Sequence, residues 1–199
     1  MTELTTASVA TVGGSAARRI PGLAALSPGA VVVGPAATCR CAPRDNLALH
    51  RLVARAPAGS VLVCGAGGET ERGHFGDLMA LDARGRGLRG LVIDGAVRDA
   101  TAVAASGFPV FHLGLAPVPC AKERALSVGE PVEVAGVLVT PGDVVVADAD
   151  AVLVVARADW AAVEAAALEL EAREEGLREA LARGERLGDL LGLDLEADA

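Results

Sequence analysis

Residues 60–99 read SVLVCGAGGETERGHFGDLMALDARGRGLRGLVIDGAVRD, and this stretch decides the fold class. Two short apolar runs, at 61–65 and 88–95, flank a segment from 75 to about 87 that has the pattern of a helix. Short apolar runs bounded by turn residues are typical of buried strands, so the stretch predicts strand, helix, strand. This order is the repeating unit of an α/β domain.

The same alternation continues on both sides of this stretch. VVVG at 31–34 precedes Asp45-Asn46, a predicted helix cap, and the helical pattern LALHRLVARA. A helix at 99–106 and a strand at 109–113 follow, and 131–156 has the short Gly-punctuated runs of an antiparallel or mixed sheet. We therefore predict one α/β domain over 19–199, ending in a long helix at about 159–183, after a flexible tail or poorly fixed first helix at 1–18.

Composition restricts the classes of function. The chain has 199 residues, 52% hydrophobic and 2% aromatic, with a formal net charge of -8. One core of this size is expected, and an acidic, aromatic-poor chain is a poor nucleic-acid binder. The uncharged stretch from Pro21 to Ala37 is broken by Pro and Gly, and the N-terminus lacks a signal-peptide pattern, so we expect a cytoplasmic protein without a membrane span. The four cysteines are expected to be reduced core thiols, with a Cys39-x-Cys41 ligand pair as the alternative.

Two acidic loops are the strongest candidates for chemistry. Gly76-Asp77-Leu78-Met79 opens one predicted helix, and Arg98-Asp99 lies between a predicted strand and the next helix. Loops that leave the carboxyl ends of neighbouring parallel strands meet in one crevice, where a carboxylate can hold a divalent cation and an arginine an anionic oxygen. These residues together predict a site for an oxo acid on a metal. Spacing alone also allows a purely structural interpretation, with Asp77 and Asp99 as helix caps and Arg98 in a surface ion pair.

Other candidates are weaker. GAGGE at 65–69 superficially resembles a nucleotide loop, but its glycines do not have the G-x-G-x-x-G spacing. His50 lies on a predicted amphipathic helix and is expected to face solvent or to be hydrogen-bonded. The aspartates of the PGD and DAD turns, Asp143, Asp148 and Asp150, are interpreted as turn caps.

The order of the motifs resembles a known family. DNLALHRLVARAPAGSVLVCGAGGE, FGDLMALDARGRGLRGLVIDGAVRD, FPVF and PVEVAGVLVTPGDVVVADADAVLVV are similar to segments of the RraA-like family. That family includes 4-hydroxy-4-methyl-2-oxoglutarate aldolase and the regulator of ribonuclease activity A. The resemblance runs from about Val31 to Val155 and implies a swivelling β/β/α-type domain that assembles into homotrimers or hexamers.

The resemblance also implies roles for individual residues. Asp99 matches the metal ligand, and Arg98 matches the arginine that contacts substrate. Gly76, Asp77, Leu78 and Met79 match the loop whose backbone amides hold the substrate carboxylate, and Asp77 in addition matches an acidic position that orients a water on the metal. Lys122, the only lysine in the chain, matches a basic position near the site. A glutamate on the C-terminal helix of a neighbouring subunit completes the metal's water shell in such a trimer, and Glu174 is the choice here, with Glu171 as the alternative.

The implied function is a carbon–carbon lyase dependent on Mg²⁺ or Mn²⁺. It cleaves 4-hydroxy-2-oxo acids to pyruvate and decarboxylates oxaloacetate. Members that act only as ribonuclease regulators tend to lack one or both aspartates that match Asp77 and Asp99, and this chain keeps both. Two alternatives stay open: a non-catalytic regulator that binds a ribonuclease, and an S-adenosylmethionine-dependent methyltransferase supported only by GAGGE.

Overall fold

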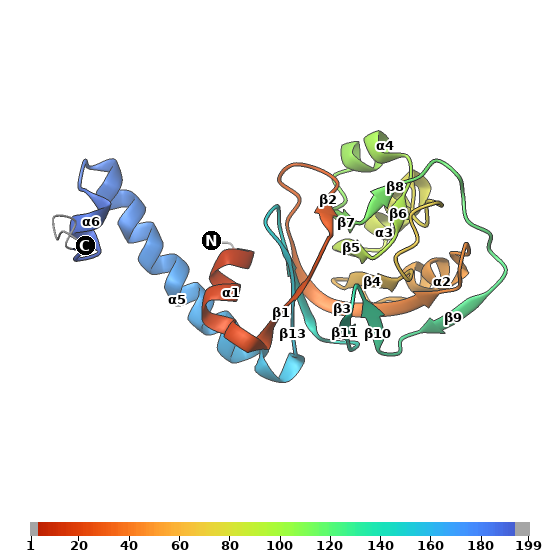
Figure 1. Cartoon of the computed structure of the whole chain (residues 1–199), viewed down its shortest axis with the longest axis horizontal. Coiled ribbons are helices and arrows are strands. Elements are labelled where there is room, and N and C mark those ends of the chain that lie inside the picture. The colour runs from red at the N-terminus through yellow and green to blue at the C-terminus, as the bar shows by residue number, and fades with distance from the viewer. Residues whose placement is uncertain (1–3, 194–199) are drawn as a thin grey trace, which may run out of the picture.

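A computed structural model describes residues 4–193, and a curled nine-stranded sheet is its largest element (Figure 1). The strand order across the sheet is β1 (Ala17–Ile20), β13 (Val152–Val155), β12 (Val144–Ala147), β3 (Val32–Cys41), β4 (Val61–Gly65), β5 (Gly90–Ile93), β7 (Val110–His112) and β2 (Ala24–Ala25). A further strand, β9 (Ala125–Val128), pairs with the end of β3. The long strand β3 joins both halves, because its first part pairs antiparallel with β12 and its second part pairs parallel with β4.

The parallel half carries the helices. Strands β3, β4, β5 and β7 run parallel, and α2 (Leu47–Arg55), α3 (Asp77–Gly85) and α4 (Ala100–Ala105) connect them in turn. The apolar sides of these helices and one face of the sheet form a core that includes Leu49, Leu62, Phe75, Ile93 and Phe108. This arrangement brings the carboxyl ends of β3, β4 and β5, and the loops that follow them, to one edge.

The opposite face of the sheet is covered by the hairpin of β10 (Val132–Val134) and β11 (Val137–Val139). Val63, Val92 and Phe111 pack there with Val134 in a second core. A small parallel pair, β6 (Ala96–Val97) with β8 (Gly114–Leu115), extends the loops at the sheet edge. The curled sheet, with helices on one face and the hairpin on the other, confirms the expected β/β/α-type α/β domain.

Where the sequence predicts a flexible tail or a poorly fixed first helix, the structure has a helix that tertiary contacts hold in place. Residues 6–13 form α1 (Thr6–Gly13), η1 (Gly14–Ala16) follows, and β1 then pairs with β13. Thr5 and Ser8 form a capping box, which supplies acceptors for the first amides of α1. Thr6 also donates from its hydroxyl to Asp148 Oδ1 at 2.6 Å. Its own periodicity is weak, and polar side chains hold the helix in place through caps and tertiary contacts.

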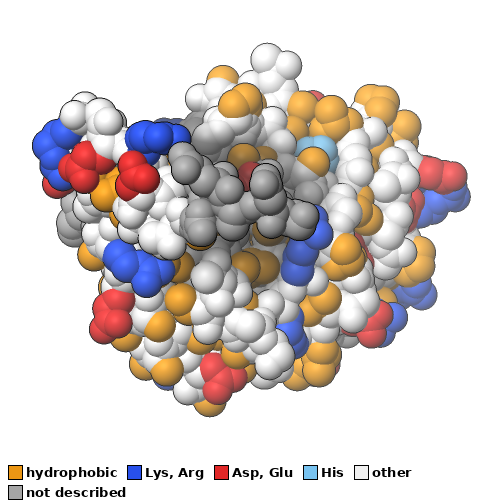
Figure 2. Space-filling model, turned by 60° about the vertical axis from the view of Figure 1, so that its left-hand side comes forward, with side chains coloured by type: hydrophobic (Ala, Val, Ile, Leu, Met, Phe, Trp, Pro, Cys, Tyr) orange, Lys and Arg blue, Asp and Glu red, His pale blue; other side chains and the backbone are white. Residues whose placement is uncertain are grey.

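The long C-terminal helix is confirmed as α5 (Arg157–Ala182), followed by α6 (Leu187–Leu190). Its first half packs against α1, while its second half projects away from the sheet (Figure 1). The face that turns toward the viewer in Figure 2 mixes hydrophobic, acidic and basic side chains without a patch of a single charge sign. Within residues 4–193 no helix is both long enough and apolar enough to cross a membrane.

Candidate functional site

The two acidic loops meet at the carboxyl edge of the parallel strands, as the sequence predicts. They line a cavity of about 150 Å³ together with residues that follow β3 and β8. Of the residues singled out from sequence, the lining includes Gly76, Asp77, Leu78, Met79, Arg98, Asp99 and Lys122, and to these the structure adds Asn46, His50, Gly73, Pro119 and Cys120. The convergence is confirmed, while the role of each side chain stays a prediction.

The first turn of α3 presents free backbone donors to this cavity. The first helical hydrogen bond runs from the Ala80 N–H to the Gly76 carbonyl at 3.0 Å. The N–H groups of Asp77, Leu78 and Met79 therefore have no acceptor within the helix. With the positive end of the helix dipole, they suit a carboxylate.

Arg98 and Asp99 lie directly beside this turn. Arg98 Nε donates to Asp99 Oδ2 at 2.9 Å, and about a third of each side chain is exposed. The Arg98 N–H donates to the Phe75 carbonyl at 2.8 Å, which fastens this loop to the segment that precedes Gly76. Part of the structural interpretation is thus correct, since Arg98 forms an ion pair. Asp99, however, stands at the N-cap position of α4 without making a cap hydrogen bond, so its carboxylate faces other partners.

Asp99 also has an unusual backbone. Its φ of 53° and ψ of 37° lie in the left-handed region, which aspartate tolerates better than most residues. Strain of this kind clusters at functional sites, because it persists only where the surrounding structure holds it.

Sequence reasoning missed Asn46 and His50. Asn46 occupies the N-cap position of α2, but the capping is done by Asp45, whose Oδ1 accepts from the Leu47 N–H at 2.8 Å. The Asn46 amide instead donates from Nδ2 to the His74 carbonyl at 2.7 Å. His50, expected to face solvent or to be hydrogen-bonded, lines the cavity one turn further along α2. Burial and the nearby charge of Lys122 lower the pKa of His50, so its imidazole is neutral at pH 7.

Cys120 and His74 are not reactive groups of this cavity. Burial raises the pKa of the Cys120 thiol to about 12, helped by the negative charge of Glu69, so it stays protonated at neutral pH. His74 is fully buried behind the cavity, with Nδ1 3.0 Å from the Arg72 carbonyl.

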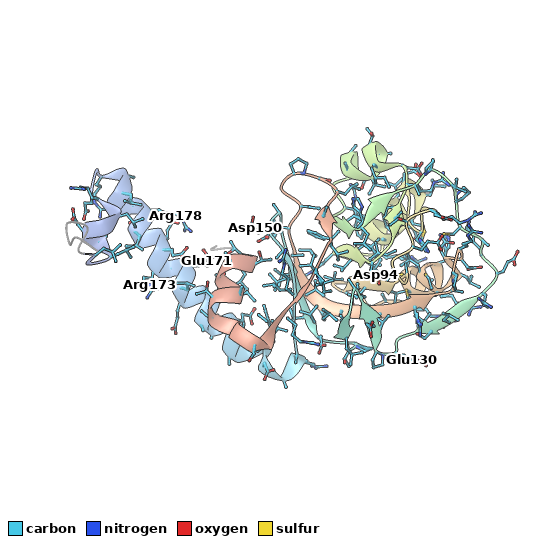
Figure 3. The ribbon with its side chains drawn as sticks, viewed as in Figure 1. Asp94, Glu130, Asp150, Glu171, Arg173 and Arg178 are labelled. Atoms are coloured by element: carbon cyan, nitrogen blue, oxygen red, sulfur yellow. The ribbon has the colours of Figure 1, made fainter. Side chains whose placement is uncertain are left out.

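The two candidate glutamates of α5 behave differently. Glu171 is 3% exposed and accepts from the Thr5 hydroxyl at 2.7 Å, so its carboxylate is engaged where α5 passes α1 (Figure 3). Glu174 is half-exposed and pairs with Arg178 at 3.1 Å. Neither lines the cavity of its own chain, and a role of Glu174 or Glu171 at the site of another subunit stays a prediction.

A hard divalent cation fits the oxygen donors of the cavity. Mg²⁺ needs only one or two protein carboxylates, because it keeps several waters, and Asp99 with Asp77 offers that number.

The residues 4–193 contain one group of three ligating side chains within 4.8 Å of one another, Cys39, Cys41 and Cys64, and all three are buried thiols. Cys41 Sγ lies 3.5 Å from Cys64 Sγ, and hydrogen bonds from the other two thiols lower the pKa of Cys41. Soft sulfur ligands do not suit Mg²⁺.

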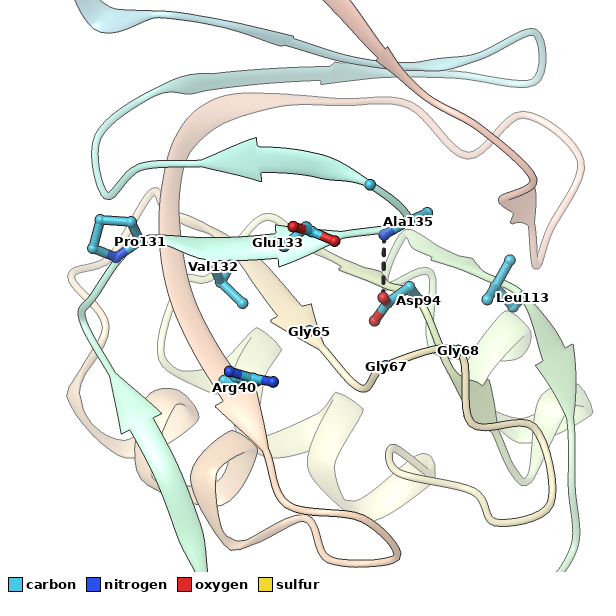
Figure 4. A pocket seen from close by; sticks show the side chains of 11 residues that line it. Arg40, Gly65, Gly67, Gly68, Asp94, Leu113, Pro131, Val132, Glu133 and Ala135 are labelled. Atoms are coloured by element: carbon cyan, nitrogen blue, oxygen red, sulfur yellow. Dashed lines mark hydrogen bonds between the residues drawn. The ribbon is translucent and has the colours of Figure 1, made fainter.

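Asp94 lines a different cavity from that of Asp99. It joins the lining of a cavity of about 470 Å³ with Arg40, Glu133 and the glycines of the 65–68 loop (Figure 4). Asp94 is 5% exposed, and its carboxylate accepts from the amides of Ala66 and Ala135. Burial raises its pKa. It ties the Gly-rich loop to the β10–β11 hairpin and does not join Asp99.

The curled α/β sheet thus carries, at its parallel edge, a cavity lined by two aspartates, an arginine and a lysine. The family model described as "RraA-like: Aldolase/RraA" matches residues 5–154 of this chain. The chain therefore belongs to the RraA-like family.

Individual relatives carry different names. A Halalkalibacterium halodurans protein named as a candidate 4-hydroxy-4-methyl-2-oxoglutarate aldolase is 39% identical over 124 residues, which are 62% of this chain and 59% of that protein. The chain spans about three fifths of the length of the first curated relatives that it matches. The structure of Streptomyces coelicolor RraAS2, titled an unusual member of the RNase ES inhibitor RraA protein family, is 30% identical with a TM-score of 0.79, over 89% of this chain and 93% of that one. A Geobacillus kaustophilus structure titled S-adenosylmethionine:2-dimethylmenaquinone methyltransferase is 29% identical with a TM-score of 0.73, over 77% and 96%.

Proposed function

We propose that this chain is a divalent-metal-dependent aldolase that cleaves 4-hydroxy-2-oxo acids, such as 4-hydroxy-4-methyl-2-oxoglutarate, to pyruvate and also decarboxylates oxaloacetate. The observation that carries the proposal is the single cavity shared by the first turn of α3, the Arg98-Asp99 pair and Lys122. The H. halodurans relative supports the same class of reaction.

The groups that line the cavity have different proposed roles, which follow from their charges. The amides of Asp77, Leu78 and Met79 bind the substrate carboxylate, and Arg98 lies where negative charge grows on the 2-oxo oxygen as the C3–C4 bond breaks. A bound Mg²⁺ or Mn²⁺, held by Asp99, supplies Lewis-acid polarisation of the 2-oxo group. Asp77 holds a water that takes the proton of the C4 hydroxyl, and C3 is then protonated to give pyruvate. Lys122 contributes positive charge at the rim, and no Schiff base is required.

A subunit assembly belongs to the proposal. We expect a homotrimer or hexamer in the cytoplasm, in which Glu174 of a neighbouring copy reaches the metal's water shell. The half-exposed position of Glu174 on the projecting helix supports this arrangement. Light scattering of the purified chain measures the assembly directly.

The regulator alternative rests on the likeness to RraAS2. A regulator of this kind needs an acidic protein surface but no pair of catalytic aspartates. This chain retains both Asp77 and Asp99 in one cavity. Capture of a ribonuclease together with absence of turnover would support it over the aldolase.

The methyltransferase alternative fits the structure poorly. The amides of Ala66 and Gly68 in the Gly-rich loop already donate to Asp94, so they are not available to a nucleotide-like ligand. We expect no S-adenosylmethionine binding by calorimetry.

The deciding experiment is a coupled assay of pyruvate release. Oxaloacetate and a panel of 4-hydroxy-2-oxo acids are supplied with Mg²⁺ or with a chelator, to the wild type and to Asp99→Ala. We expect Mg²⁺-dependent release that falls by roughly 10²-fold or more in the variant, the size typical of a lost charge-stabilising group. Unchanged, chelator-insensitive release by the variant overturns the proposal.

A further inference from the structure

The cavity that Asp94 lines is separate from the candidate active site and has no part in the proposed reaction. Its volume of about 470 Å³ lies within the range of about 300–1,000 Å³ that is usual for small-molecule sites. The β10–β11 hairpin supplies part of its wall, whereas α2 and α3 supply part of the wall around Asp99. Within residues 4–193 no residue lines both cavities, so the two are independent places for a ligand.

Close packing gives this cavity firm walls. A Cβ atom on Gly65 would lie 2.7 Å from the Glu133 carbonyl oxygen, so only glycine lets β4 and β10 approach this closely. The Asp94 carboxylate accepts from the amides of Ala66 and Ala135 and thereby joins the Gly-rich loop to the hairpin. The cavity is thus bounded by paired strands and by loops that hydrogen bonds hold in place.

The Gly-rich loop offers space to a ligand but few hydrogen-bond donors. Cβ atoms on Gly67 and Gly68 would meet nothing within 4 Å, so the backbone there borders open space. The N–H groups of Ala66 and Gly68 already donate to Asp94, one to its carboxylate and the other to its carbonyl. The charged groups of a ligand in this cavity must therefore meet side chains.

Two side chains of opposite charge are available for that purpose. Arg40, near the end of β3, and Glu133, in β10, both line the cavity and are exposed. Neither makes an ion pair within residues 4–193. Strand pairing fixes both backbones, that of Arg40 between β4 and β9 and that of Glu133 beside β11. Figure 4 shows the two side chains on either side of Gly65.

The charges of the cavity favour a ligand that carries both signs. Within the described part of the chain, Arg40 is the only cationic side chain that lines it, and Asp94 and Glu133 are the acidic ones. A ligand with only a positive group is repelled by Arg40, and a ligand with only a negative group is repelled by Glu133. A small zwitterion avoids both repulsions, because its carboxylate accepts from the guanidinium and its ammonium group donates to the glutamate. Both contacts are charge-assisted hydrogen bonds.

We propose that this cavity binds a small zwitterion of the α-amino acid type, with the ligand carboxylate on Arg40 and the ligand ammonium group on Glu133. Leu113 and Pro131 offer apolar surface to its side chain. This site is additional to the oxo-acid site, and no step of the proposed reaction passes through it.

Binding to the full chain tests the proposal. The rise in Tm is measured with each standard L-amino acid, and isothermal calorimetry then follows the amino acid that gives the largest rise. We expect one binding event per chain. Arg40→Gln and Glu133→Gln should each weaken it by at least about tenfold, the size of a lost hydrogen bond to a charged group.

Derivatives of the same amino acid identify which group meets which side chain. Its C-terminal amide lacks the carboxylate charge, and its N-acetyl derivative lacks the ammonium charge. The wild type should bind each at least about tenfold more weakly than the parent amino acid. Arg40→Gln should bind the amide and the parent alike, and Glu133→Gln should bind the N-acetyl derivative and the parent alike, because each variant has already lost that interaction.

Arg51→Gln and Glu130→Gln are the matched controls, since they remove the same charges at exposed positions outside the cavity. Both should bind the parent amino acid within about twofold of the wild type. The proposal is overturned if no amino acid raises the Tm, or if Arg40→Gln and Glu133→Gln bind as tightly as the wild type. Equal binding of the parent and its two derivatives by the wild type also overturns it. None of these measurements uses pyruvate release, so their result is independent of the proposed function.

Discussion

A Cβ atom placed on Gly76 would lie 2.7 Å from Oδ2 of Asp99 and 3.0 Å from Cγ of Arg98. The first turn of α3 thus approaches the Arg98-Asp99 pair so closely that no side chain larger than that of glycine fits at position 76 without a shift of the pair. Gly76 has φ of -144°, which any residue adopts, so close packing and not backbone freedom requires glycine here.

Gly76→Ala is therefore expected to displace the Asp99 carboxylate and to lower kcat/KM for pyruvate release by roughly 10²-fold, as misplacement by about 1 Å does in other sites. Gly85→Ala, at the other end of α3, is the matched control, since its Cβ meets nothing within 4 Å. Steady-state kinetics of both variants measure the effect. Equal activity in the two would contradict the proposed contact.

Metal binding is expected to depend on Asp99 and not on acidic residues in general. Asp99→Asn keeps the left-handed backbone, which asparagine also tolerates, and removes the negative charge. We expect it to weaken Mg²⁺ binding at least about tenfold, because even changes to groups that only support a metal ligand reach that size. Asp82→Asn, which alters an exposed carboxylate on α3 paired with Arg86, should leave the affinity unchanged in isothermal calorimetry. Equal loss in both variants would indicate nonspecific binding.

Docking of α1 is expected to weaken in acid. The Thr5 hydroxyl lowers the pKa of Glu171 below its ordinary value of 4.5, with smaller contributions from Ser8 and Arg178. Folding therefore favours the ionised carboxylate, and its stabilisation is complete above pH 4.5 and disappears as the pH falls through the lower folded-state pKa.

Glu171→Gln tests this dependence by chemical denaturation. At pH 7 it should lower the free energy of unfolding by about 1–2 kcal/mol, and the difference from the wild type should shrink below pH 4.5. Glu175→Gln, an exposed change on the same helix, is the control and should have little effect at either pH. If the free energy of unfolding of Glu171→Gln is lower than that of the wild type by the same amount at every pH, the charge of the Glu171 carboxylate is unimportant.

The β10–β11 hairpin is expected to gain stability from a better turn residue. Ala135 and Gly136 both have positive φ, 46° and 82°, in the two-residue turn between Val134 and Val137. Such turns favour Asn-Gly, because asparagine tolerates the left-handed region better than alanine does. Ala135→Asn should raise the free energy of unfolding by about 0.5–1 kcal/mol. Gly136→Ala should lower it, and the opposite signs are read from thermal melts of the two variants.

Short apolar runs and helical periods predicted the α/β class, the parallel strands and the long C-terminal helix, because these features follow from local burial patterns. The meeting of Gly76, Arg98 and Asp99 was also predictable, since loops at the carboxyl ends of parallel strands collect at one edge. The firm attachment of helix α1 was not predictable, because Thr5 and Thr6 act through partners more than 140 residues away, Glu171 and Asp148.

Sequence by itself therefore determined the architecture and which acidic loops share a cavity. Tertiary structure decided the use of individual polar side chains. Asp45-Asn46 looks like one capping unit in the sequence, yet Asp45 caps the helix while Asn46 turns to the His74 carbonyl and leaves its own Oδ1 buried without a partner. The physical reason is that hydrogen-bond partners distant in sequence compete for the same polar atoms, and only the packed chain fixes which partner each atom meets.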